Sequence, residues 1–293
     1  MKRLILLVVA GCAAWLVAGL PNAAAVPATV TCTDAFSGTA FNVIVPDDNF
    51  CVLSGATITH DLIIGADAGA GAGLGASEPG LTVGYDVTLQ HDSEVDFGAT
   101  VIGHDLITTT NDALHLERTT IDTDLVAFQP GTVQTGQVGP DTPGGPVRVG
   151  RDLVIQGTPP DNDFVFDGMC DLTVGRDFRM IDRSVTLGVG FGDQSGAQEV
   201  CSGRQSNTIG RDLVFTGNSA LSGFFGPSSI EVGNNRVGHD LIFTSNTAVQ
   251  GGFLEVSDNV VGHDAICANN SPAPSGDDSS DGPNTVGHTN TCG

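Results

Sequence analysis

Histidines and aspartates recur near the C-terminal end of the chain with a spacing that suits a metal site. His239-Asp240, His263-Asp264 and His288 follow one another at intervals of about 25 residues. Imidazole nitrogens bind zinc, nickel or copper, whereas carboxylate and amide oxygens suit calcium. The pattern therefore predicts a metal site at these five residues, with calcium as the alternative cation and no other cofactor required.

The acidic position of this motif recurs from one end of the chain to the other, at separations of 19 to 35 residues. Nine aspartates occupy it, and Thr289 takes the tenth place: Asp61, Asp86, Asp105, Asp124, Asp152, Asp177, Asp212, Asp240 and Asp264. A binding site is usually local, but this motif recurs in every copy. We therefore favour a structural role, in which each aspartate holds a bend, over a column of bound cations.

A column of like charges needs compensation. Two carboxylates one strand apart repel by about 1 kcal/mol in water, and by more inside a protein. Three sources of compensation stay open from the sequence: backbone N–H groups of the bend, bound cations, and the preceding Arg151, Arg176 and Arg211. The other residues at this preceding position are His60, Tyr85, His104, Thr123, His239, His263 and His288.

The elements that position these residues follow from the repeated phrase Val/Ile-Gly-His/Arg-Asp-Leu. A β-branched aliphatic residue stands three places before the acidic position in all ten copies, and leucine usually stands one place after it. Glycine stands two places before it in eight copies, with Thr59 and Asp122 as the exceptions. Alternating apolar residues on both sides of a glycine predict a short strand, a bend and a second short strand.

Self-similarity at a period of 20 to 50 residues is typical of stacked repeats. We predict an all-β protein: a single right-handed parallel β-helix of about ten coils with disulfide-linked ends. Asparagines at matching positions, such as Asn235 and Asn259, predict hydrogen-bonded columns at the corners. The unequal spacing predicts loops that leave the stack at 65–80, 129–146, 183–205 and 271–282.

The termini predict export and the domain organisation. Residues 1–25 resemble a secretory signal peptide cleaved after Ala25, with a basic start, an apolar run and a small-residue end. A lipid anchor on Cys12 is the alternative. We assign 26–56 to an N-terminal cap and first turn, and 57–293 to the repeats, with an acidic loop in the last coil, 271–293. No later stretch predicts a transmembrane anchor.

Cysteine count predicts three disulfides, because six cysteines follow the signal peptide in a chain expected to be exported. Cys267 and Cys292 occupy the same register in neighbouring coils, where strands about 4.8 Å apart allow a disulfide. Cys32 with Cys51 would close the first turn. The remaining pair is Cys170 with Cys201.

Charge limits the partners. The chain has 34 acidic residues against 11 basic ones and a net charge of −23, and the only lysine lies in the signal peptide. Such a charge repels nucleic acid and anionic membrane surfaces. We therefore expect no nucleic-acid partner.

An aliphatic strip two places after the acidic position offers a surface for contact. Alternation predicts that its side chains point away from the core, which suits either β propensity alone or lateral association. Its members are Ile63, Ile107, Val126, Val154, Val214, Ile242 and Ile266. The partners we expect are cell-envelope polymer or further copies of the chain.

Catalytic motifs are absent from the sequence, and we predict no catalytic residues. The paired acids Asp47-Asp48 and 277–278 lie near the two ends, and Asp177 beside Arg179 is a generic match to a lyase site. No Ser-His-Asp signature, phosphate loop or nucleotide fingerprint is present. An enzyme of this fold would act on polysaccharide, with its site in loops of the middle coils, between Asp152 and Asp212.

Motifs along the whole mature chain resemble those of secreted, actinobacterial-type β-helix repeat proteins. The repeated phrase is in turn similar to the repeat of bactofilin-type polymer-forming proteins. The supporting segments are Thr31-Cys32, Val43-Ile44-Val45-Pro46, Cys51-Val52-Leu53, Cys267-Ala268-Asn269-Asn270 and Asn284-Thr285-Val286-Gly287. The resemblance implies an extracellular location and no catalytic residues. We therefore expect a non-catalytic structural or interaction scaffold, with a carbohydrate-active enzyme as the alternative.

Overall fold

The computed structural model describes residues 28–73, 78–136, 145–158, 165–192, 201, 206–223, 226–275 and 282–292. The predicted signal peptide, Cys12 and parts of the predicted loops lie outside these residues. The described residues form strands and turns without a helix, so they include no helix capable of spanning a membrane.

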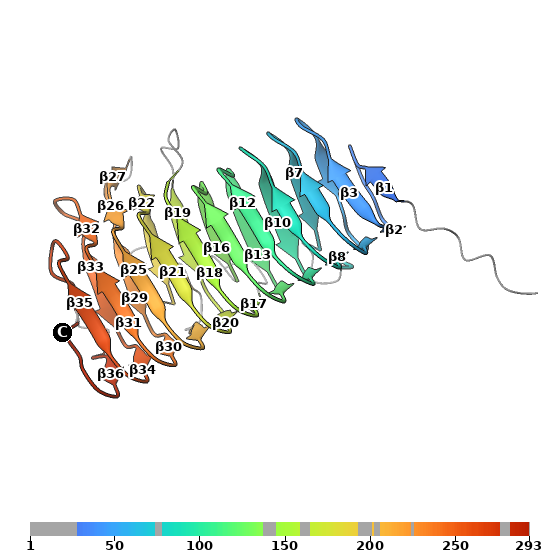
Figure 1. Cartoon of the computed structure of the whole chain (residues 1–293). Coiled ribbons are helices and arrows are strands. Elements are labelled where there is room, and N and C mark those ends of the chain that lie inside the picture. Colours follow the sequence, from blue (N-terminus) through green and yellow to red (C-terminus); the bar gives the residue numbers. More distant parts are fainter. Residues whose placement is uncertain are drawn as a thin grey trace, which may run out of the picture.

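The strands belong to three long parallel sheets that wind around one core. Figure 1 shows the coils stacked in a single row from β1 at the N-terminal end to β36 at the C-terminal end. Each strand pairs in parallel with the equivalent strand of the next coil, as Leu106 pairs with Leu125 and Leu125 with Leu153. The predicted all-β parallel β-helix is confirmed, while its handedness stays a prediction.

Sheets A and C come from the repeated phrase, and each has eleven strands. Sheet A follows the acidic position: β1 (Thr29–Thr31), β3 (Asn42–Val45), β6 (Leu62–Ile64), β9 (Val87–Leu89), β12 (Leu106–Thr109), β15 (Leu125–Phe128), β18 (Leu153–Gln156), β21 (Phe178–Ile181), β25 (Leu213–Thr216), β31 (Leu241–Thr244) and β35 (Ala265–Ala268). Sheet C precedes it: β2 (Thr39–Ala40), β5 (Thr57–Ile58), β8 (Thr82–Val83), β11 (Val101–Ile102), β14 (Thr120–Ile121), β17 (Val147–Val149), β20 (Leu172–Val174), β24 (Thr208–Ile209), β30 (Arg236–Val237), β34 (Val260–Val261) and β36 (Thr285–Val286).

Sheet B closes each coil on the third side and has nine strands. They are β4 (Phe50–Val52), β7 (Gly69–Ala72), β10 (Glu94–Gly98), β13 (Ala113–Glu117), β16 (Thr132–Thr135), β19 (Phe166–Met169), β23 (Gly188–Phe191), β29 (Ile230–Gly233) and β33 (Leu254–Ser257). Two small sheets complete the described strands: β22 (Ser184–Val185), β26 (Ser219–Ala220) and β32 (Thr247–Ala248), and the antiparallel pair β27 (Ser222–Gly223) and β28 (Gly226–Pro227).

Three predicted loops are partly wrong, because they contain strands of sheet B. Strand β7 lies within 65–80, β16 within 129–146 and β23 within 183–205. The clearest reason is seen at β7, where the Gly-Ala alternation carries no large apolar residue to mark a strand. Glycine also leaves room for a neighbouring ring there, since a Cβ on Gly69 would lie 2.6 Å from the side chain of Phe50.

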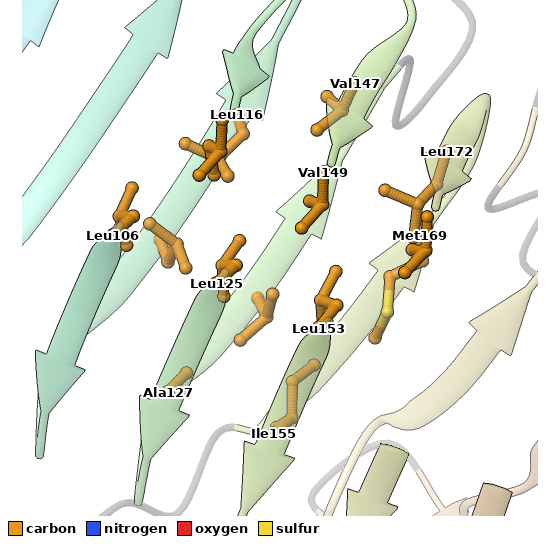
Figure 2. Packing of buried hydrophobic residues seen from close by; sticks show 14 of the residues in the cluster. Leu106, Leu116, Leu125, Ala127, Val147, Val149, Leu153, Ile155, Met169 and Leu172 are labelled. Atoms are coloured by element: carbon orange, nitrogen blue, oxygen red, sulfur yellow. The ribbon is translucent and has the colours of Figure 1, made fainter. Parts of the chain in front are cut away.

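The core consists of aliphatic and aromatic columns that run along the rod. Figure 2 shows Leu106, Leu125 and Leu153 in one row on neighbouring strands of sheet A, all fully buried. Farther along, the buried rings of Phe178 and Phe215 lie 5.5 Å apart and stack. Equivalent residues in successive coils thus pack on one another, and no coil has a complete core alone.

The corner glycines are required by the stacking of coils. A Cβ on Gly175 would lie 2.1 Å from the carbonyl oxygen of Gly150, and one on Gly210 would lie 2.1 Å from that of Gly175. The repeated glycine therefore reflects close contact between coils at the corner. The predicted asparagine columns are also present, since Asn235 Nδ2 donates to Oδ1 of Asn259 at 2.9 Å.

All three predicted disulfides are present. Cys32–Cys51 lies in the first coils, Cys170–Cys201 in the middle and Cys267–Cys292 in the last coil. The Cα atoms of the last pair are 4.8 Å apart, which agrees with the register predicted from the repeat. Three disulfides indicate an oxidising environment.

An ion pair lies inside the core of the middle coils, at a position where the neighbouring coils have valine. Asp167 pairs in register with Val133 and Val189, and its carboxylate accepts hydrogen bonds from Nε and Nη2 of Arg183 at 2.7 and 2.9 Å. Both side chains are fully buried. The Arg183 guanidinium also donates to backbone carbonyls, including that of Gly157 at 3.2 Å, so the buried charges are fully hydrogen-bonded.

We expect removal of one partner of this pair to destabilise the fold strongly. Arg183→Met leaves the carboxylate of Asp167 buried without its counter-ion, which should lower the free energy of unfolding by about 3–5 kcal/mol. The double variant Arg183→Met/Asp167→Val should recover much of this loss. Denaturant unfolding measures both, with Arg236→Met on the exposed face of sheet C as control. Additive losses in the double variant would contradict the prediction.

Candidate functional site

The aspartate column joins each coil to the following one. Oδ1 of each aspartate accepts a hydrogen bond from the backbone amide at the same position of the next coil, over 2.9 to 3.4 Å. The column begins one coil earlier than the sequence analysis placed it, because Asn42 accepts a hydrogen bond from the amide of Asp61 at 3.1 Å. The aspartates therefore have a structural role, and they act between coils.

The residue that precedes each aspartate forms a second column beside the first. Arginines occupy it in the middle of the rod, where Nε of Arg151 donates to Oδ1 of Asp124 at 2.8 Å and Nη2 donates to Oδ2. The next two arginines repeat this contact, Arg176 with Asp152 and Arg211 with Asp177, each with an Nε–Oδ1 distance of 2.7 Å. Each arginine thus pairs with the aspartate of the preceding coil.

These contacts change the ionisation of the column. Burial by itself raises the pKa of Asp124, but the hydrogen bonds from Arg151 and from the amide of Asp152 outweigh it and lower this pKa overall. The pKa of Asp152 is lowered in the same way by Arg176 and the amide of Asp177. The carboxylates of Asp124 and Asp152 are therefore held as anions by their neighbours.

Asp177, which the sequence offered as a generic match to a lyase site, is occupied by structural contacts. Its side chain is fully buried and accepts hydrogen bonds from Arg211, from Arg179 at 2.8 Å and from the amide of Asp212. These contacts give the Asp177 carboxylate a structural role in joining neighbouring coils.

Aromatic rings occupy the second column at the N-terminal end. Phe41, His60, Tyr85 and His104 stack in sequence, with centroid distances of 4.7, 5.1 and 4.5 Å. The sequence analysis placed the last three in this column but missed Phe41, whose position beside Asn42 could have revealed it. Nδ1 of His104 lies 2.7 Å from Oδ1 of Asp86, and this hydrogen bond raises the pKa of the imidazole above 6.5.

Imidazoles occupy the second column at the C-terminal end, and the five residues predicted to bind metal lie together there. The rings of His239, His263 and His288 stack with centroid distances of 4.8 and 5.2 Å and interplanar angles of 7° and 9°. Nδ1 of His263 lies 3.0 Å from Asp240, and Nδ1 of His288 lies 2.9 Å from Asp264. These groups form two triplets, His239-Asp240-His263 and His263-Asp264-His288, each with donor atoms within 4.8 Å of one another.

A further cluster on the outer face of sheet B was missed by the sequence analysis. Asp96 and His115 are paired across neighbouring strands, with Nδ1 of His115 3.4 Å from Oδ1 of Asp96 and Nε2 3.8 Å from Oε1 of Glu117. Burial raises the pKa of Asp96, which His115 only partly opposes. The register of sheet B brings these residues together. No sequence signal marked the cluster, because these residues lie outside the repeated phrase.

The enzyme markers noted in the sequence do not meet in one place among the described residues. Asp47 and Asp48 lie at the N-terminal end, while 277–278 falls outside the described residues. The middle-coil loops include 159–164, 193–200 and 202–205, which also lie outside them. The described parts of the middle coils contain the Arg–Asp column and the buried Arg183–Asp167 pair.

Comparison of the chain with the known protein families, the curated proteins and the solved structures found no match.

We expect the proton affinity of His104 to depend on Asp86. The hydrogen bond stabilises the imidazolium, so its stabilising effect on the fold is present below pH 6.5 and is lost as the pH rises through the raised pKa of His104. Asp86→Asn should return this pKa towards its ordinary value, and NMR titration of the ring measures it. Asp92→Asn changes an aspartate outside the column and should leave the pKa of His104 raised. An unchanged pKa of His104 would contradict the assignment.

Proposed function

We propose that this protein is a non-catalytic extracellular scaffold, a rod whose outer faces contact cell-envelope polymer or further copies of the chain. The observation that carries the proposal is the aspartate column. Its carboxylates accept amide protons from coil to coil along the rod, so the most regular chemical feature of the chain serves its architecture. A structure built from repeated internal contacts suits a mechanical or display role.

Three features support an extracellular location. Residues 1–25 have the pattern of a signal peptide, the chain has three disulfides, and its motifs resemble secreted β-helix repeat proteins. In the alternative version of this proposal, Cys12 carries a lipid that holds the rod on the membrane surface. The signal peptide, the six cysteines and the irregular coil lengths distinguish the chain from bactofilin-type proteins, so we do not propose a cytoskeletal polymer.

The aliphatic strip on the outer face of sheet A is the surface we assign to self-association. Its residues pair in register from coil to coil, for example Ile107 with Val126 and Val126 with Val154. They are half-buried by their neighbours, and Ile266 at the C-terminal end is 36% exposed. Arg179 interrupts the strip within the middle coils. Thr88 interrupts it between Ile63 and Ile107. The remaining apolar segments suit contact with the same strip of a second rod.

We expect the purified mature chain to form oligomers through this strip. Ile107→Glu/Ile242→Glu places charges on it and should shift the protein to monomer in sedimentation velocity, because a buried carboxylate opposes contact. Thr208→Glu on the exposed face of sheet C is the matched control and should leave association unchanged. Runs with and without calcium test whether the cation bridges the acidic rods. A monomer under both conditions would remove self-association from the proposal.

A carbohydrate-active enzyme remains the second candidate function, and the cluster on sheet B favours it. Asp96 has a raised pKa and lies beside His115 and Glu117, which supplies an acid and a base within one site. The cluster lies in coils nearer the N-terminus than the region between Asp152 and Asp212 proposed from the sequence.

Turnover of polysaccharide separates the two functions. The scaffold proposal predicts no release of sugar ends from acidic or neutral polysaccharides incubated with the mature chain. Turnover that falls by 100-fold or more in Asp96→Asn, about the contribution of one acid or base, would establish the enzyme and overturn the scaffold. Asp112→Asn, an aspartate outside the cluster, is the matched control.

A further inference from the structure

The column beside the aspartates changes its chemistry along the rod. In the middle coils it consists of arginines, whose charge is permanent, but in the last three coils it consists of histidines. Within the described part of the chain, the ion pairs of Asp240 and Asp264 are made with imidazoles alone. These two carboxylates therefore have no permanent counter-ion at neutral pH, in a chain whose net charge of −23 attracts cations.

The imidazoles and carboxylates alternate with nearly constant separations. Asp240 lies between Nδ1 of His239 at 3.2 Å and Nδ1 of His263 at 3.0 Å. Asp264 lies in the same way between Nδ1 of His263 at 3.3 Å and Nδ1 of His288 at 2.9 Å. Ligand bonds of about 2.0–2.1 Å at a tetrahedral angle put neighbouring ligand atoms about 3.3 Å apart. The two imidazoles of each triplet face different oxygens of the shared carboxylate, as His239 faces Oδ2 and His263 faces Oδ1 of Asp240. With either oxygen as the ligand atom, one nitrogen–oxygen separation of each triplet therefore already matches that of a tetrahedral metal site.

Accessibility and preorganisation also suit a metal. The imidazoles are about half-exposed or more, at 53%, 49% and 69% of their side-chain surface, so an ion can reach them from solvent. The rings are held nearly parallel by the stacking of coils. All three ligand atoms of each triplet lie within 4.8 Å of one another.

We propose that this column binds one transition-metal cation, with zinc, nickel and copper as the chemical class. His263 is the central ligand, and it acts either with His239 and Asp240 or with His288 and Asp264. Two imidazole nitrogens and one carboxylate oxygen are a ligand set for these ions, whereas calcium requires six to eight oxygens. Solvent completes the coordination. This inference does not depend on the proposed scaffold function.

The stoichiometry follows from the shared ligand. Both triplets need His263, so they exclude each other and the chain binds a single ion. Loss of either outer histidine leaves one complete triplet, whereas loss of His263 destroys both. The pattern of variants is therefore specific to this geometry.

A third triplet, Asp86-His104-Asp105, is a weaker candidate for two reasons. It supplies one imidazole instead of two. The Nδ1 atom of His104 also lies closer to a carboxylate, 2.7 Å from Asp86, than those of His263 and His288 do at 3.0 and 2.9 Å, so a metal would have to displace a more tightly held proton.

Isothermal titration of the disulfide-bonded mature chain with zinc chloride alone at pH 7.5 tests the proposal. We expect one ion per chain. His239→Ala and His288→Ala should each weaken binding by only about twofold, because one of two equivalent triplets remains. His263→Ala and the double variant His239→Ala/His288→Ala should weaken it by more than about 100-fold, which exceeds the effect of losing a supporting group.

Controls distinguish a site from general attraction to an acidic protein. His91→Ala removes an exposed histidine outside the column and should leave zinc binding unchanged, and His263→Gln keeps a polar side chain but should lose binding as His263→Ala does. Thermal unfolding verifies that each variant is folded. Absence of zinc binding, zinc binding retained in folded His263→Ala, or calcium bound as tightly as zinc would each overturn the proposal.

Discussion

The parallel pairing of coils is the constraint on which the rest of the structure depends. Each residue lies one strand spacing from the residue at the same position of the next coil. Side chains at equivalent positions of successive coils are therefore neighbours and must be compatible with one another. Glycine meets this condition at the corner, where a Cβ would collide with the carbonyl of the preceding coil. Leucine and phenylalanine meet it in the core, where Phe178 and Phe215 stack.

Aspartates are the residues least suited to such stacking, because their carboxylates repel one another. Two sets of contacts compensate for this repulsion. The first is a hydrogen bond that each aspartate accepts from the backbone amide of the following coil, so the charge is stabilised wherever the strands are paired. The neighbouring column then adds arginine in the middle of the rod and imidazole at both ends. The same geometry thus yields permanent ion pairs in one region and titratable, metal-competent groups in another.

Most of the fold could be predicted because its signals repeat. Ten copies of one phrase identified two of the three sheets, the corner between them and the register of Cys267 with Cys292. The third sheet was largely missed, because its strands carry no common pattern and β7 is made of glycine and alanine. Asp167 was missed for a related reason: an aspartate at an inward position is recognisable only when Arg183, 16 residues away, is seen to enter the core.

The sequence by itself determined the columns, since periodic spacing places the aspartates, histidines and arginines at equivalent corners. Only the tertiary structure decided which partner each side chain takes. Arg151 pairs with Asp124, 27 residues earlier in the chain, and not simply with the adjacent Asp152. The physical reason is that parallel pairing holds equivalent positions of stacked coils one strand apart, which brings each of these side chains within reach of the aspartate of the preceding coil. The same contact between coils brings His239, Asp240 and His263 within reach of one ion.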